Sequence, residues 1–163
     1  MNRLLLGLLA IAGAGLWLLA GPGARSAPQA TSSAPQYLEG DAYQKARGFS
    51  PAVITRSGRI IWLAGQTATQ DLNGKSLLGD FQGQARTVFA LMDRTLKRDG
   101  ASLKNLVNMT VFINDPRNGD QLVKLRQELF PDGKFPASTM ITVSNFAQPG
   151  MMIEIQGVAV VPQ

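Results

Sequence analysis

The chain has 163 residues, with 16 Lys and Arg against 11 Asp and Glu, and it contains neither Cys nor His. This length suits one domain. Without His there is no imidazole general base, and without Cys there is neither a thiolate nucleophile nor a disulfide. Zinc sites of the usual nitrogen and sulfur type are excluded for the same reason. Any proton transfer must therefore fall to carboxylates, Lys, Tyr, hydroxyl groups or water.

The first 26 residues have the pattern of an export signal. Arg3 supplies a positive charge, and residues 4–20 follow it without a charged or polar side chain. A Gly-Pro-Gly triplet then breaks any helix, and a small-x-small cleavage site ends at Ser26. We therefore expect residues 1–26 to be a signal peptide and the mature protein to begin at Ala27, exported to the periplasm or secreted. The alternative is an uncleaved membrane anchor, because the apolar run lies at the short end of a membrane span.

Removal of the predicted signal peptide lowers the net charge. The loss of Arg3 and Arg25 leaves 14 cations against 11 acids, so the charge falls from +5 to +3 over the remaining 137 residues. These cations are scattered, and no cluster of them alternates with aromatic residues. We therefore expect no nucleic-acid partner and, after cleavage, no stable association with a membrane.

Residues 27–48 have the composition of a linker, because Ala, Ser, Gln, Pro and Gly are frequent there. We predict a flexible tether with one extended piece near Tyr37 and Leu38. The regular signals begin after this stretch, so we place the folded domain at residues 49–163.

A β-hairpin is predicted at the start of this domain. Residues 51–55 and 60–64 are runs of β-branched, aromatic and other apolar residues, and Ser57-Gly58 lies between them as a turn signal. Asn73-Gly74 predicts a second tight turn further along the chain.

Two helices are predicted from the spacing of apolar residues. In residues 80–98 the apolar positions recur at intervals of three and four, which places them on one face of a helix. These positions are Phe81, Ala85, Val88, Phe89, Met92 and Leu96. Gly100 ends this helix. Residues 118–130 show the same pattern and form the second predicted helix.

Three further runs, residues 107–113, 139–143 and 152–161, are predicted as strands. The order of the elements favours an α+β fold with a mixed sheet, or an α/β variant of it, and the two helices can cover only one face. Residues 60–63 and 151–153 nevertheless carry apolar groups toward both faces, which is typical of strands buried on both sides. The economical cover for the second face is another copy of the chain, so we expect a homo-oligomer.

Four short motifs follow one another along residues 49–163. They are Ala64-Gly65-Gln66, Thr110-Val111-Phe112-Ile113 before Asn114-Asp115, Phe135-Pro136-Ala137, and Ile153-Glu154-Ile155. In this order, with two predicted helices between them, they resemble the Rid family, the reactive intermediate deaminases typified by RidA. The resemblance implies a chorismate-mutase-like fold and a homotrimer around a central barrel. It also implies a small-molecule ligand in a cleft at each subunit interface, with neither metal nor cofactor.

Family deaminases hydrolyse imines and enamines to ketones and ammonia. The resemblance implies that Glu154 holds the carboxylate position associated with the attacking water. A carboxylate is able to orient and partly deprotonate water beside a C=N carbon. The alternative is a structural acid that makes hydrogen bonds at an interface, because a buried acid needs partners in either case.

The resemblance also marks a missing residue. Family deaminases carry an arginine that binds the substrate carboxylate through two parallel hydrogen bonds, and Ser138 holds that position here. A neutral hydroxyl contributes one weaker hydrogen bond and no charge. Arg117 and Arg126 are the nearby residues that would compensate, from a neighbouring subunit.

Other positions of the implied cleft depart from the family in the same direction. Phe49 replaces a tyrosine, Ala64 a serine and Val123 an asparagine, and Met140 adds an apolar side chain. Gly65 is retained, and its backbone is able to approach a ligand closely, although a bend at a strand end explains it equally. The sequence therefore predicts a cleft that prefers neutral or weakly polar ligands to carboxylates.

Two classes of function remain open. The first is a non-catalytic small-molecule-binding protein that kept the fold and lost the chemistry, which the missing arginine favours. The alternative is an exported imine or enamine deaminase that uses Glu154 and water on a less acidic substrate. An RNA-cleaving activity, sometimes attached to the family, is a lesser candidate because the mature charge is modest and His is absent.

Overall fold

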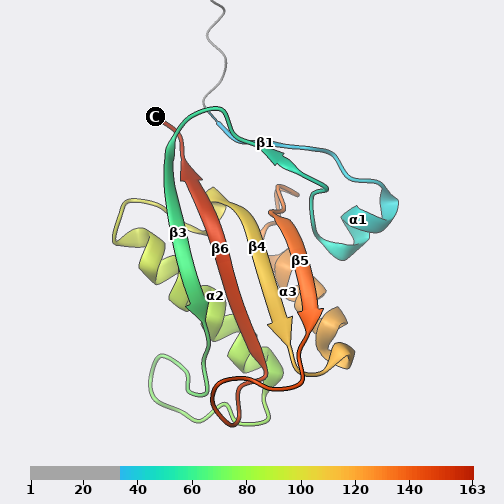
Figure 1. Ribbon diagram of the computed structural model, residues 1–163, viewed down its shortest axis with the longest axis vertical. Coiled ribbons are helices and arrows are strands. Elements are labelled where there is room, and N and C mark those ends of the chain that lie inside the picture. Colours follow the sequence, from blue (N-terminus) through green and yellow to red (C-terminus); the bar gives the residue numbers. More distant parts are fainter. Residues whose placement is uncertain (1–33) are drawn as a thin grey trace, which may run out of the picture. The chain divides into compact units, whose positions relative to one another are not determined.

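The computed structural model describes residues 34–163 (Figure 1). The predicted signal peptide, residues 1–26, and the first part of the predicted linker lie outside these residues. Within the described part of the chain, no helix is long and apolar enough to cross a membrane.

The centre of the fold is a four-stranded mixed sheet. Its strands are β3 (Arg59–Gln66), β4 (Leu106–Ile113), β5 (Ala137–Thr142) and β6 (Ile153–Val161), in the order β3-β6-β4-β5. The pair β4–β5 is parallel, whereas β6 is antiparallel to both of its neighbours. The mixed sheet that the sequence predicts is therefore confirmed, with strand bounds within two residues of those expected.

Two long helices cover one face of this sheet. They are α2 (Phe81–Lys97) and α3 (Gly119–Leu129), and both lie behind the strands in Figure 1. The side chain of Asp80 begins α2 because it accepts a hydrogen bond from the backbone N–H of Gly83. The core lies between the helices and the sheet, and its fully buried members include Val88, Met92, Leu96, Met109, Val111, Leu122, Leu125 and Ile155.

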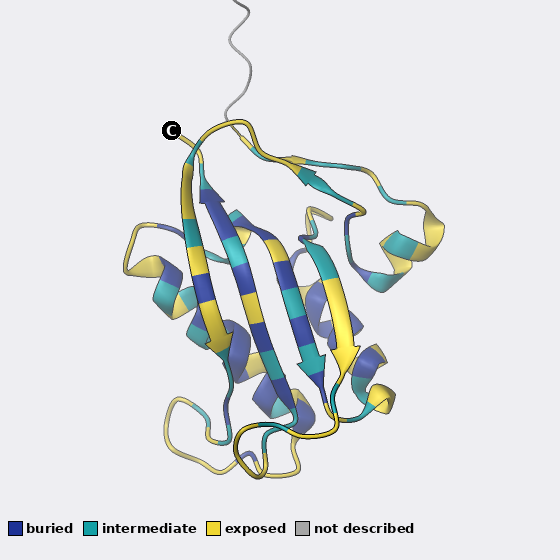
Figure 2. Cartoon of the chain, in the orientation of Figure 1, coloured by how far each residue is buried: buried dark blue, intermediate teal, exposed yellow. Residues whose placement is uncertain are grey.

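The second face of the sheet carries no helix. Figure 2 shows the alternation of buried and exposed residues along the central strands. The side chains of Ile60 and Trp62 are 54% and 77% exposed, and Ile141 is exposed on the opposite edge. Large apolar side chains on a free sheet face are typical of a surface that another protein copy covers. The homotrimer itself stays a prediction.

The predicted hairpin between residues 51–55 and 60–64 is wrong. The strand β2 (Val53–Ile54) pairs antiparallel with β1 (Gln36–Tyr37), and β3 pairs with β6 instead. The predicted turn residue Gly58 has a φ of 122°, and it lies so close to β6 that a Cβ there would overlap the backbone of Val161. The chain therefore passes the end of β6 at Gly58, and β3 begins at the next residue, where Arg59 pairs with Val161.

The stretch expected as a linker contains regular structure in its described part. The helix α1 (Ala42–Arg47) begins with a capping box in which Asp41 and Gln44 bond each other's backbone N–H groups, and it ends at Gly48. Its last turn is tied to α3, because the side chain of Gln127 donates to the carbonyl of Ala46 at 3.1 Å. Residues 42–48 are thus held against the folded domain.

Two single-turn 3-10 helices complete the described elements. They are η1 (Leu103–Asn105), before β4, and η2 (Pro116–Asn118), before α3. The second turn that the sequence predicts, at Asn73-Gly74, is confirmed: Gly74 has a φ of 85° and its N–H donates to the carbonyl of Asp71.

Candidate functional site

The structure divides the predicted site residues between two faces of the sheet. Ser138 on β5 lies opposite Met109 of β4, and Glu154 on β6 lies opposite Phe112 of β4. Positions 109 and 112 point to opposite faces of β4, because side chains alternate along a strand. Ser138 therefore belongs to the helix-covered face and Glu154 to the open face. Val123 is buried in α3 and lines neither of the two pockets described below.

On the open face, Glu154 lines a pocket of about 300 Å³ that we call the acid pocket. Its other lining residues are Phe112, Val143, Asn145, Phe146, Ala147 and Gln156. Glu154 is half-buried, and within residues 34–163 its carboxylate has neither a hydrogen bond nor an ion pair. Its oxygens are therefore available to accept hydrogen bonds from water or from a ligand.

Gly65 lies directly beside this carboxylate. The register of β3 against β6 shifts by one residue between Leu63 and Gln66, which places Ala64 and Gly65 in a β-bulge. A Cβ at Gly65 would overlap Oε1 of Glu154. The predicted close approach at Gly65 is therefore to a protein carboxylate, and any larger residue would displace that carboxylate from its position.

A buried glutamine of α2, which the sequence analysis did not single out, fixes the loop that walls the acid pocket. The side-chain amide of Gln84 donates to the carbonyls of Leu77 and Gly150, at 3.0 and 2.8 Å, and accepts from the N–H of Met152 at 2.9 Å. A signal existed, because Gln84 lies three residues after Phe81 on the apolar face of the helix. A polar residue there requires buried partners.

The other predicted residues meet on the helix-covered side, in a pocket of about 200 Å³ that we call the arginine pocket. It is lined by Tyr43, Arg47, Phe49, Arg126, Ser138 and Met140. The rings of Tyr43 and Phe49 stand edge to face, 6.5 Å apart. The structure thus brings together three predicted ligand-binding residues, Phe49, Ser138 and Met140, and adds two arginines to them.

Arg126 supplies a guanidinium next to the serine that replaces the family arginine. Its Nη1 donates to Oγ of Ser138 at 2.9 Å, and its Nη2 donates to the backbone carbonyl of Arg47 at 2.8 Å. Its Nε is buried without a hydrogen-bond partner. The guanidinium beside Ser138 therefore belongs to α3 of the same chain, whereas the sequence analysis placed a compensating arginine in a neighbouring subunit.

The electrostatic environment of this arginine is unusual. Arg126 is only 3% exposed, and no ion pair joins it to a carboxylate of residues 34–163. Burial, and secondarily the neighbouring charge of Arg47, lowers the pKa of Arg126 to about 10. The guanidinium nevertheless remains protonated at neutral pH.

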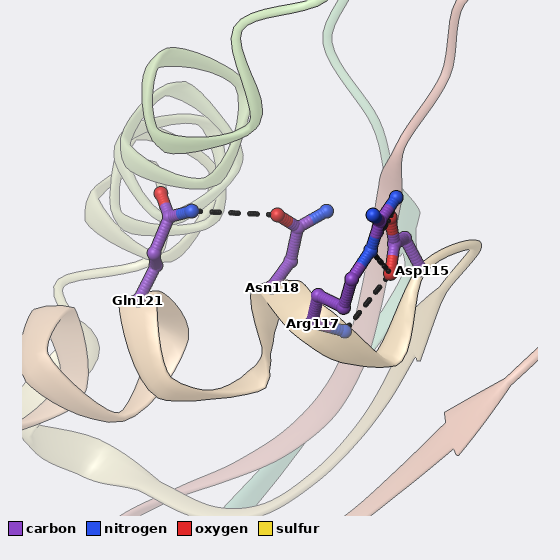
Figure 3. A network of polar contacts seen from close by, with 4 residues as sticks. All are labelled: Asp115, Arg117, Asn118 and Gln121. Atoms are coloured by element: carbon purple, nitrogen blue, oxygen red, sulfur yellow. Dashed lines mark hydrogen bonds and ion pairs between the residues drawn. The ribbon is translucent and has the colours of Figure 1, made fainter.

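Arg117, the other arginine proposed to compensate, is engaged elsewhere. Figure 3 shows it folded onto Asp115, to which its Nε and Nη2 donate at 2.9 and 2.6 Å. These hydrogen bonds lower the pKa of Asp115 and raise the pKa of Arg117. Further along the chain, Gln121 of α3 donates a hydrogen bond to Asn118, the last residue of η2, at 3.4 Å. Arg117 lines neither the acid pocket nor the arginine pocket.

Metal ligands are not grouped in the described part of the chain. Among residues 34–163, no three acidic side chains converge in a way that would hold a metal ion. The polar groups that line the two pockets are the carboxylate of Glu154, the amides of Asn145 and Gln156, the guanidinium groups of Arg47 and Arg126, and the hydroxyl groups of Tyr43 and Ser138.

The comparisons with known proteins agree with the motifs. A model of the family described as Endoribonuclease L-PSP matches residues 39–161. The chain belongs to this family. The match begins within the stretch expected as a linker and includes α1.

Relatives of known sequence carry the RutC family name. The RutC family protein PH0854 of Pyrococcus horikoshii is 27% identical over 64% of this chain and 81% of its own length. The RutC family protein YjgH of Escherichia coli is 28% identical over 66% of this chain and 80% of its own length.

Solved structures confirm the Rid-family resemblance. YyfB of Yersinia pestis, described as a member of the conserved Rid protein family, superposes with a TM-score of 0.68 and 26% identity, covering 78% of this chain and 98% of its own. YyfA of the same organism, also described as a Rid-family protein, gives a TM-score of 0.58 at 26% identity, over 78% of this chain and all of its own. The fold is the chorismate-mutase-like fold of this family.

Proposed function

We propose that this Rid-family protein binds a small molecule in a cleft that forms between the subunits of a homotrimer. The observation that carries the proposal is the separation of the two pockets. The arginine pocket and the acid pocket lie on opposite faces of one sheet. A single chain is unable to bring both to one small ligand, whereas an adjacent copy is able to place its acid pocket against the arginine pocket.

The free face of the sheet supports the same assembly. Ile60 and Trp62 on β3, the neighbour of the strand that carries Glu154, and Ile141 on β5 at the other edge expose large apolar side chains on this face. Burying such side chains against another copy stabilises association by about 25 cal/mol for each Å² removed from water. Association through this face would enclose the acid pocket, which is open in one chain.

A second candidate function is hydrolysis of an imine, and the unpartnered carboxylate of Glu154 favours it. In this reaction Glu154 accepts a proton from water while the water oxygen bonds to the C=N carbon. The carboxylic acid returns the proton to nitrogen, which gives a carbinolamine. The hydroxyl proton of the carbinolamine then passes to its amino nitrogen, the C–N bond breaks, and the C–O bond becomes the ketone C=O. One imine and one water then yield one ketone and one ammonia, with no oxidant, reductant or metal required.

The test of the binding proposal couples ligand affinity to assembly. Trp62→Lys places a charge in the exposed apolar face and is expected to give a monomer by light scattering. Leu72→Lys is the matched control, because Leu72 is also exposed but lies in the loop between β3 and α2. Calorimetric titration with 2-oxobutyrate and with its methyl ester should detect binding to the unmodified protein and to Leu72→Lys. The Trp62→Lys monomer should bind at least ten-fold more weakly.

Two results would contradict the proposal. Equal affinity of the monomeric variant and the unmodified protein would show that one chain forms the complete site. If neither 2-oxobutyrate nor its methyl ester bound to the unmodified protein, small 2-oxo compounds would be excluded as its ligands. Hydrolysis is tested separately by ammonia release from imines that an amino-acid oxidase generates in situ. Glu154→Gln should lower this rate about 100-fold, and an unchanged rate would exclude Glu154 as the base.

A further inference from the structure

The helix α1 borders the arginine pocket but contributes no side chain to the core. None of its six residues is buried, and no other described helix or strand packs extensively against it. Two of its residues, Tyr43 and Arg47, nevertheless line the pocket, and Phe49, which follows the helix, lines it with them. One wall of the pocket is therefore built from a segment that the hydrophobic core does not hold in place.

The contacts that hold α1 to other elements are polar and few. Among residues 34–163, three such contacts join α1 to another element, and all of them lead from its last turn to α3. The side chain of Gln127 donates to the carbonyl of Ala46 at 3.1 Å, and Nη2 of Arg126 donates to the carbonyl of Arg47 at 2.8 Å. The guanidinium of Arg47 also pairs with Asp120 at the surface. Surface contacts of these kinds contribute little to stability, because water replaces the lost partner.

Two cavities adjoin this part of the chain. The first is the arginine pocket, and the second, of about 190 Å³, is lined by Lys45 of α1 and by Ser50, Phe135 and neighbouring residues. The side chain of Phe49 lines both cavities. Close packing is what restrains a segment in a protein interior, and here cavities take its place. Few apolar contacts and exposed backbone hydrogen bonds are the properties of segments that open locally.

Fixed points and glycines lie at both ends of the segment. The backbone N–H groups of Leu38 and Ser50 donate to carbonyl groups outside it, at 3.0 and 3.3 Å, and Ser50 is buried. Between these two residues, Gly40 precedes α1 and Gly48 ends it. Gly48 has a φ of 65°, a conformation that residues with a side chain rarely adopt. Changes of φ and ψ at a few such positions are sufficient to move a short segment as a unit.

The position of α1 in the structure has a cost in free energy. With α1 in place, Arg126 is only 3% exposed, and its Nη2 reaches the carbonyl of Arg47 instead of water. Burial of this charge, with a secondary effect of the charge of Arg47, lowers the pKa of Arg126 to about 10. Movement of α1 away from α3 would return water to the guanidinium. This gain offsets part of the polar contacts that are lost, so the two positions are close in free energy.

We propose that residues 39–48 form a lid, which opens about Gly40 and Gly48 and controls access to the arginine pocket. In the open position, Tyr43 and Arg47 withdraw from the pocket wall, and Arg126 meets solvent. In the closed position, which is the one in the structure, the lid separates the pocket from bulk water. This inference rests on the proposed binding function, because it states how the arginine-pocket side of the proposed cleft is entered.

The test follows the accessibility of Arg126 without any ligand. Phenylglyoxal modifies accessible guanidinium groups, and mass spectrometry of peptides gives the rate at Arg126 relative to Arg56. Arg56 is exposed and has no ion pair among the described residues, so it serves as the internal reference. The double variant Asp120→Ala/Gln127→Ala removes two of the three contacts that close the lid. It should raise the relative rate at Arg126 about ten-fold.

The matched control is the double variant Gln121→Ala/Glu128→Ala. It also removes one glutamine and one acid from the exposed side of α3, but their partners, Asn118 and Arg86, lie outside the lid. The relative rate at Arg126 should equal that of the unmodified protein.

Hydrogen exchange separates opening of the lid from unfolding of α3. The amide of Lys45, which donates to the carbonyl of Asp41 within the lid, should exchange faster than the amide of Leu122, which is buried in α3. In Asp120→Ala/Gln127→Ala the amide of Lys45 should accelerate further, while the amide of Leu122 keeps its rate.

The outcomes distinguish the lid from the proposed cleft. If the relative rate at Arg126 rises as expected but 2-oxobutyrate and its methyl ester bind to no form of the protein, the lid stands and the proposed ligand class fails. Equal rates at Arg126 in the two double variants would overturn the lid. Acceleration at Arg126 that is matched by faster exchange of Leu122 would also overturn it, because α3 itself would then be unfolding.

Discussion

At the residue scale, Gly65 leaves the space that the carboxylate of Glu154 occupies. Its backbone passes so close to Glu154 that a Cβ would overlap the carboxylate. The sequence left two explanations for this glycine, close approach to a ligand and a bend at a strand end. The structure adds a third, because the glycine makes room for the acid of the same pocket.

We predict that Gly65→Ala destabilises the protein by about 1–3 kcal/mol, the usual effect of one methyl group too many in a packed site. The measurement is urea denaturation at fixed protein concentration. In the Glu154→Ala background the same substitution should cost less than half as much, because the overlapping group is absent. Equal effects in the two backgrounds would mean that the strain does not involve Glu154.

Burial of the charged side chain of Arg126 lowers the stability of the folded protein. Burial lowers its pKa from the ordinary value to about 10, which corresponds to roughly 3 kcal/mol of lost stability. Because the folded state binds this proton less tightly than the unfolded state, the loss is present below pH 10 and fades as the pH rises above that value.

We expect Arg126→Met to unfold at an equal or higher urea concentration than the unmodified protein. Methionine fills a similar space without a charge, and the freed carbonyl of Arg47 offsets about 1 kcal/mol of the gain. Arg86→Met, on the exposed side of α2, should change the free energy of unfolding by less than about 0.5 kcal/mol. A loss of more than 2 kcal/mol in Arg126→Met would identify Arg126 as a structural residue.

At the scale of elements, α2 does more than cover the sheet. Gln84 uses its whole amide to hold the end of the 67–80 loop and the start of β6. The loop between β5 and β6 supplies Val143, Asn145 and Phe146 to the acid pocket. The helix thereby fixes the wall of a pocket on the far side of the sheet.

We predict that Gln84→Leu lowers the free energy of unfolding by about 3 kcal/mol, because it leaves buried backbone groups of Leu77, Gly150 and Met152 without partners. Gln82 lies two residues earlier in the same helix and is exposed, so Gln82→Leu should change the free energy of unfolding by less than about 0.5 kcal/mol. Hydrogen exchange at the Met152 amide supplies the local readout. It should accelerate in Gln84→Leu alone, and unchanged protection would contradict the role of this glutamine.

The elements also show where sequence patterns succeed. The periodicity of apolar residues predicts α2 and α3 to within one residue at each end, because burial of one face decides a helix. The same pattern is weak for α1, which has six residues and no buried side chain. Its capping box, Asp41 with Gln44, was the available signal. The pairing of β2 was missed because the partner of a strand depends on residues distant in sequence.

At the scale of the whole molecule, the proposed cleft requires residues from two subunits. Glu154→Gln removes the carboxylate of the acid pocket, and Ser138→Phe fills the arginine pocket of the same chain. Each variant by itself should assemble and fail in ammonia release. Trimers that contain both kinds of subunit should regain activity, since some interfaces then combine an intact acid pocket with an intact arginine pocket.

The control for this mixing experiment is a chain that carries both substitutions. Mixed with either single variant, it supplies no missing pocket and should restore nothing. Recovery should also require exchange of subunits, so proteins mixed without unfolding should recover more slowly than co-expressed ones. Activity that stays at the level of the single variants in co-expressed trimers would contradict a shared cleft.

The sequence by itself determined the chemistry that is absent, the principal elements and the family. The lack of His and Cys is a matter of composition, and the helices and strands follow from periodicities that one segment contains. The four motifs, in order and with two predicted helices between them, carried the resemblance. Only the tertiary structure decided which face each site residue occupies and which cation stands beside Ser138. Arg126 lies on α3 and Ser138 on β5, and their contact depends on how a helix packs across a strand edge. A periodic pattern states which side of its own element a residue faces, and it carries no information about the residue that faces it from another.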